Sequence, residues 1–217
     1  ESQIRQPEAK YQKRIATLKK FQVHDPKAMN VPPYHPDTDA VRQDWARYAD
    51  MITFMDTEVG RVLRQLDKDG LAENTIVFYF SDHGGALPRG KRNIHDTGTR
   101  VPLIIRFPEK WEHLAPKTKN DNGIAQQLVA FVDFPATVVN LCGLKIPDIW
   151  EGKPFLGPNA QERDFVYLYR GRMDERYDTV RAIRTKWQLY VRNFSPHRPL
   201  GQAYTYPFRV LASMGSW

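Results

Sequence analysis

The chain has 217 residues, of which 41% are hydrophobic and 12% aromatic, so it can bury a core and is not wholly disordered. Its 32 basic and 25 acidic residues give a formal net charge of +7, without a basic stripe or a nucleic-acid-binding motif. We therefore expect no nucleic-acid partner, and leave open whether the basic surface attracts sulfated polymers or is simply solvated. No apolar stretch is long enough to span a membrane, and the polar start carries no signal peptide.

The first 37 residues are polar, and residues 11–21 are expected to form a short helix within them. Residues 37–70 show the clearest pattern, because apolar side chains recur at alternating steps of four and three and form one helical stripe. Either Asp37 or Thr38 can cap the start of this helix. We interpret the stripe as core packing. It consists of Val41, Trp45, Tyr48, Ile52, Met55, Val59, Val62 and Leu66.

Two short apolar runs, residues 74–80 and 101–107, are rich in β-branched and aromatic residues and predict strands buried on both faces. A helix followed by such strands indicates the α/β class, with helices flanking a sheet. Residues 133–143 predict a further helix. Cys142, in its apolar last turn, is the only cysteine, so an intrachain disulfide is excluded and we expect a buried, inert thiol.

A loop rich in proline and glycine, residues 144–163, separates these elements from three segments of alternating polarity. Such alternation predicts a small antiparallel sheet. We therefore predict two domains, residues 1–160 and residues 161–217, of which the second is the start of a small β subdomain. The three predicted strands are residues 165–170, 179–184 and 187–192.

Residues with candidate chemistry follow the first predicted strand. Asp82 and His83 lie at its carboxyl end, where ligands bind in α/β sheets. A carboxylate suits Ca²⁺ or Mg²⁺, and an imidazole can complete a mixed site, although a turn-capping acid beside a structural histidine explains the pair equally well. Lys91 can neutralise a tetrahedral anion, although taken alone it fits an ordinary surface lysine better, and His95 can either donate to a substrate oxygen or pack in the interior.

Four segments of the chain form a recognisable ordered set: Asp56-Thr-Glu-Val-Gly60, Ser81-Asp-His-Gly84, Gly98-Thr-Arg-Val-Pro-Leu-Ile104 and Val132-Asp-Phe-Pro-Ala-Thr137. In order and spacing they resemble the type I sulfatases of the alkaline phosphatase superfamily. This resemblance implies a sulfatase-like sheet flanked by helices, with Asp82 and His83 as two calcium ligands and Lys91 in contact with the sulfate group. It also implies an exported protein, whether periplasmic, secreted or lysosomal.

The family uses a formylglycine nucleophile, made within a Cys/Ser-x-Pro-x-Arg motif, and an adjacent pair of aspartates as further metal ligands. Neither sequence occurs in these 217 residues. We therefore expect the chain to be the carboxyl-side portion of a sulfatase, inactive alone, with the formylglycine encoded upstream. The expected cofactor is Ca²⁺, with Mg²⁺ or Mn²⁺ less favoured, and the oligomeric state is left open.

Residues 181–184, 191–194 and 197–199 look similar to heparan N-sulfatases and their bacterial relatives. The resemblance implies hydrolysis of a sulfate ester or a sulfamate on a sulfated carbohydrate. Arg172, Asp174 and Arg176 are candidate substrate contacts, although a salt-bridged surface turn explains them as well. Two alternatives stay open: a phosphonate monoesterase or phosphodiesterase of the same superfamily, and a non-catalytic protein that binds sulfated polyanions.

Overall fold

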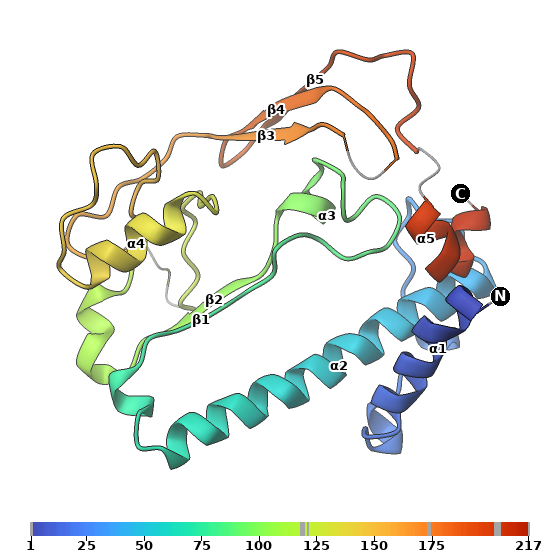
Figure 1. The fold of residues 1–217 in the computed structure, drawn as a ribbon, viewed down its shortest axis with the longest axis horizontal. Coiled ribbons are helices and arrows are strands. Elements are labelled where there is room, and N and C mark those ends of the chain that lie inside the picture. The colour runs from blue at the N-terminus through green and yellow to red at the C-terminus, as the bar shows by residue number, and fades with distance from the viewer. Residues whose placement is uncertain (1, 118–119, 121, 173–174, 202–204, 217) are drawn as a thin grey trace.

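A long helix and two small antiparallel sheets dominate the computed structural model (Figure 1). The structure describes every residue except 1, 118–119, 121, 173–174, 202–204 and 217. The helices are α1 (Ser2–Ile15), α2 (Asp39–Lys68), α3 (Asp96–Thr99), α4 (Asp133–Leu141) and α5 (Thr205–Val210), and the strands are β1 (Val77–Phe80), β2 (Leu103–Arg106), β3 (Val166–Arg170), β4 (Val180–Arg184) and β5 (Leu189–Asn193). Short 3₁₀ turns are Lys20–Gln22, Pro26–Ala28, Ala72–Asn74, Glu109–Leu114 and Ala212–Ser216.

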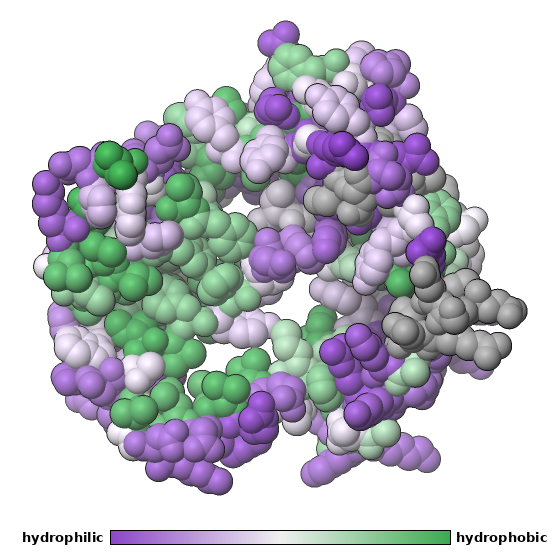
Figure 2. Space-filling view, in the orientation of Figure 1, coloured by the Kyte–Doolittle hydropathy of each residue, from purple (hydrophilic) through white to green (hydrophobic). Residues whose placement is uncertain are grey.

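Helix α2 lies within two residues of its predicted bounds, but of its apolar stripe only Val41 is buried, and Trp45 and Tyr48 are half-buried. The Thr38 hydroxyl accepts a hydrogen bond from Val41 N at 3.3 Å and caps the helix, and Val41 is buried. Farther along, Ile52, Met55 and Val62 are 38–58% exposed, so the prediction of core packing is wrong for them. The helix diverges from β1 and β2, and the space between them stays open (Figures 1 and 2).

Helix α1 begins and ends earlier than the short helix that was predicted at residues 11–21. It is fastened to α2 where the Tyr11 hydroxyl donates a 2.6 Å hydrogen bond to the buried Asp50 carboxylate. Burial and this hydrogen bond raise the pKa of Tyr11. Within the described residues, no helix is both long and apolar enough to cross a membrane.

Strands β1 and β2 are shorter than predicted and pair directly with each other in antiparallel orientation, with Phe80 opposite Leu103. The prediction of burial on both faces is wrong, because Phe80 is 44% and Ile104 63% exposed. Hydrophobic residues gather on this side of the molecule, at the left of Figure 2. Because the strands are antiparallel, the end of β1 meets the start of β2, and residues 81–102 form a single loop region there.

Helix α4 packs against the end of β1, where the rings of Phe80 and Phe134 meet edge to face at 4.8 Å. The buried Asp133 carboxylate pairs with Arg163 and also accepts two backbone N–H groups, which ties the following loop to the helix. Cys142 caps the far end of the helix and is exposed, so the prediction of a buried thiol is wrong.

Strands β3, β4 and β5 confirm the three predicted strands and form an antiparallel sheet in that order. Alternate residues face inward, and Ile94 from the loop after β1 packs on them. The small sheet therefore covers this loop, as Figure 1 shows. The division into domains at residue 160 stays a prediction. The inward-facing apolar residues in this cluster are Leu168, Val180, Ala182 and Leu189.

Candidate functional site

The loop between β1 and β2 carries the candidate site, and close backbone packing determines its shape. Gly84 N donates to Gly98 O at 3.0 Å, and Lys91 N donates to Gly85 O at 2.8 Å. A Cβ atom at Gly84 would lie only 1.9 Å from Thr97 O, so glycine is required for this approach. The turn after β1 is thereby held against the short helix α3.

Asp82 and His83 lie side by side in this turn, with 3.4 Å between Asp82 Oδ2 and His83 Nε2. His83 Nδ1 is 2.9 Å from Gly84 O. Because a carbonyl can only accept, His83 Nδ1 donates this hydrogen bond, and Nε2 is the ring atom that faces the Asp82 carboxylate. An imidazole nitrogen and a carboxylate oxygen at this distance can both reach one metal cation.

The donor chemistry of this pair fits a divalent cation, but as part of a coordination sphere. Calcium takes about six to eight ligands, mostly oxygen, so Asp82 and His83 would supply only a minority of them. Among the residues that the structure describes, no group of three or more His, Cys, Asp or Glu side chains could hold a metal. The Asp82 side chain is 82% exposed, which leaves room for further ligands.

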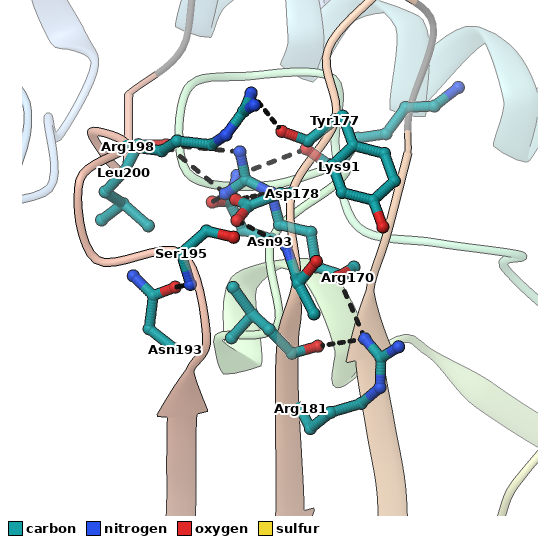
Figure 3. Close-up of polar contacts among 12 residues, drawn as sticks. Lys91, Asn93, Arg170, Tyr177, Asp178, Arg181, Asn193, Ser195, Arg198 and Leu200 are labelled. Atoms are coloured by element: carbon teal, nitrogen blue, oxygen red, sulfur yellow. Dashed lines mark hydrogen bonds and ion pairs between the residues drawn. The ribbon is translucent and has the colours of Figure 1, made fainter.

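Lys91 lies half-buried in the second part of the loop. In the described part of the chain, no hydrogen bond or ion pair engages its amine. Its carbonyl oxygen accepts a hydrogen bond of 3.4 Å from Asn93 Nδ2, and its side chain extends away from the polar cluster behind it (Figure 3). The ammonium is therefore available to an anionic ligand.

His95 precedes helix α3, and its Nε2 is buried without a hydrogen-bond partner among the described residues. Burial lowers the pKa of His95, and the positive charges of Arg89 and Arg170 lower it further. The imidazole is therefore neutral at pH 7, and a buried ring nitrogen without a partner is unusual in a folded protein.

Of the three candidate substrate contacts in the charged turn, the structure describes two. Arg172 and Arg176 are exposed between β3 and β4, and each interacts with other residues. Asp174 lies outside the described residues. Their proposed contact with substrate stays a prediction.

Two arginines of the small sheet reach the site loop, and the sequence analysis did not identify them. Arg170 Nε pairs with Asp178 Oδ2 at 3.1 Å, and Arg170 Nη1 donates to Asn93 Oδ1 at 3.3 Å (Figure 3). Arg184 Nη1 pairs with Asp96 Oδ1 at 3.0 Å. The alternation of side chains along the strands could have indicated these two arginines. Both lie on the inward face of the sheet, where a charged side chain needs a partner.

Comparison with known proteins assigns the family. Residues 5–144 match the family model described as Sulfatase. The chain belongs to the sulfatase family. The chain is 43% identical over 170 residues to an ulvan-active sulfatase of Formosa agariphila, and this alignment covers 78% of the chain and 27% of that protein. The chain is also 30% identical over 126 residues to the N-sulphoglucosamine sulphohydrolase of Homo sapiens, and this alignment covers 58% of the chain and 24% of that protein.

A solved sulfatase structure from Bacteroides fragilis shares the fold. It aligns with a TM-score of 0.59 at 22% sequence identity and covers 82% of this chain and 38% of that chain. The fold class that the sequence predicts, part of a sulfatase-like sheet with helices and a small antiparallel sheet, is thereby confirmed. The chain spans about a quarter of the length of the two curated relatives, at 27% and 24%.

Proposed function

We propose that the full-length gene product is a sulfuric ester hydrolase that cleaves sulfate esters or sulfamates on a sulfated carbohydrate. The observation that carries this proposal is the site loop itself, in which Asp82, His83 and the available Lys91 ammonium follow one strand. Membership of the sulfatase family supports it, as do relatives named for ulvan and for N-sulphoglucosamine. Family resemblance also underlies our proposal that the protein is exported.

On this proposal, the residues of the site loop would have three different roles in the reaction. Asp82 and His83 would hold a calcium ion, which would act as a Lewis acid on sulfate oxygens. Lys91 would offset the negative charge of the transferring group. His95, neutral at pH 7, would hydrogen-bond a substrate oxygen through its buried Nε2.

The proposed reaction also needs a nucleophile, which is not among the residues of the site loop. We propose that it is a formylglycine encoded elsewhere in the gene, because no Cys/Ser-x-Pro-x-Arg sequence occurs in these 217 residues. On this proposal, residues 1–217 expressed alone release no sulfate. Sulfate release by this segment alone would refute that part of the proposal.

The test measures sulfate released by the full-length gene product from glucosamine N-sulfate and from ulvan oligosaccharides, by ion chromatography. Lys91→Ala should lower kcat/KM by about 100-fold or more, the usual effect of removing a group that stabilises transition-state charge. Lys145→Ala is the matched control, because the Lys145 side chain is 81% exposed and pairs across a surface turn with the equally exposed Asp148. Its kinetics should equal those of the wild type.

Three outcomes would contradict the proposal. Unchanged kinetics in Lys91→Ala would remove Lys91 from the mechanism. Hydrolysis of a phosphonate monoester without sulfate release would favour the other hydrolases of the superfamily. Salt-sensitive binding of heparin with no hydrolysis of any of these substrates would identify a binding protein.

A further inference from the structure

The small sheet contacts the site loop at three positions that lie close together in sequence. Ile94 packs on the apolar inward face of the sheet. Asn93 and Asp96, on either side of it, are each held by an arginine of the sheet, Arg170 and Arg184 respectively. Lys91 lies only two residues before the first of these positions. We propose that the two arginines form a clamp that positions Lys91 for contact with the sulfate group.

The first arm of this arginine clamp runs from a buried ion pair through two part-buried hydrogen bonds to the Lys91 backbone (Figure 3). The side chains of Arg170 and Asp178 are 5% and 7% exposed, and their ion pair fixes the plane of the guanidinium. Another guanidinium N–H then reaches Asn93 Oδ1 at 3.3 Å, and Asn93 Nδ2 reaches Lys91 O at 3.4 Å. A single asparagine therefore links the arginine to the backbone of Lys91.

The second arm is a bidentate ion pair at the other end of the segment formed by residues 93–96. Arg184 Nη1 and Nη2 lie 3.0 Å and 3.1 Å from the two carboxylate oxygens of Asp96. Asp96 begins helix α3 and directly follows His95. The two arms therefore hold the segment from both ends, and the packed Ile94 lies between them.

The backbone around Lys91 needs such support. Arg89 and Arg92, on either side of it, have φ values of 64° and 77°, a left-handed conformation that residues other than glycine rarely adopt. Conformations of this kind persist only where the surrounding structure imposes them. The clamp grips the chain immediately after Arg92, so its loss would let the loop relax and carry the Lys91 ammonium to another place.

This inference rests on the proposed function of Lys91, and Asn93→Ala is the variant that tests it. The substitution cuts the relay but leaves the buried Arg170–Asp178 pair intact, so the fold should survive. In the full-length gene product we expect kcat/KM for sulfate release to fall by about 10-fold to 100-fold, as for misplaced catalytic groups. Asn30→Ala, at an exposed asparagine, is the control and should match the wild type.

A double-mutant cycle separates positioning from a general structural role. If Asn93 acts through Lys91, the Asn93→Ala/Lys91→Ala double variant should be no slower than Lys91→Ala alone. An independent readout is protection of the Lys91 amine by sulfate against reductive methylation, followed by mass spectrometry. Protection should be lost in Asn93→Ala and retained in Asn30→Ala.

The outcomes distinguish the two proposals. If Lys91→Ala impairs sulfate release but the two substitutions have multiplicative effects, the clamp is overturned and the proposed function stands. Unchanged protection of the amine in Asn93→Ala would also overturn the clamp. If Lys91→Ala leaves the kinetics unchanged, the proposed role of Lys91 fails, and the clamp fails with it.

Discussion

Replacing Gly84 by alanine tests whether close backbone packing shapes the site loop. The added Cβ would lie 1.9 Å from Thr97 O and 2.7 Å from Gly98 Cα, so one backbone segment must move by about 1.5 Å to restore ordinary contact distances. This movement breaks the hydrogen bond from Gly84 N to Gly98 O, worth about 1 kcal/mol, and overpacking costs about 1–3 kcal/mol more. We expect the free energy of unfolding to fall by about 2–4 kcal/mol.

Urea denaturation of the full-length gene product measures this loss. Gly171→Ala is the matched control, because a Cβ atom there meets nothing within 4 Å and Gly171 is not left-handed. The control should change the free energy of unfolding by no more than about 0.5 kcal/mol. Since Gly84 is not left-handed either, steric overlap alone distinguishes the two sites. Equal, small losses in both variants would refute the reasoning.

Burial lowers the pKa of His35, so its stabilising effect is complete above about pH 6.5 and is lost as the pH falls through the lower pKa of the folded state. His35→Gln should therefore remove up to about 1.4 kcal/mol per pH unit from the pH dependence of unfolding between pH 7 and 5, and an unchanged slope would contradict this. Asp133→Asn should cost about 3–5 kcal/mol, because the mostly buried Arg163 loses its charged partner; a melting temperature within about 2 °C of the wild type would exclude this. On the proposed calcium site, free calcium at about 100 times its Kd should stabilise the wild type by about 2.7 kcal/mol, and Asp82→Asn should abolish this thermal stabilisation; a retained response would show that the ion binds elsewhere.

The sequence predicted the positions of helices and strands better than it predicted which of their side chains are buried. Helix α2 is capped by Thr38, one of the two residues expected for that place, because capping and side-chain periodicity are local properties of the chain. The same periodicity cannot say how far along the helix a covering surface extends, and Ile52 and Val62 are exposed for that reason. Cys142 was misjudged similarly, since an apolar segment does not reveal on which side of the helix end a residue lies.

In the candidate site too, contacts between residues adjacent in sequence could be predicted, and contacts between distant residues could not. Asp82 and His83 could be predicted as neighbours because they are adjacent in sequence, and the structure places their side chains 3.4 Å apart. The partners of the site loop could not, since Arg170 and Arg184 come from strands about 80 residues away, with separations of 77 and 88 residues to Asn93 and Asp96. Pairs this distant have no characteristic spacing, and only the inward position of an arginine in a strand points to them.

The ladder of β1 and β2 also has a consequence for handling the protein. Among the described residues each of these strands pairs only with the other, so each leaves one row of backbone N–H and C=O groups without a strand partner. Such edges can pair with the edges of other molecules, and the exposed Phe80 and Ile104 make that association more favourable. Residues 1–217 expressed alone should therefore self-associate as their concentration rises, which light scattering would reveal. A soluble preparation of this segment would need a charged residue on the edge or a partner that covers it.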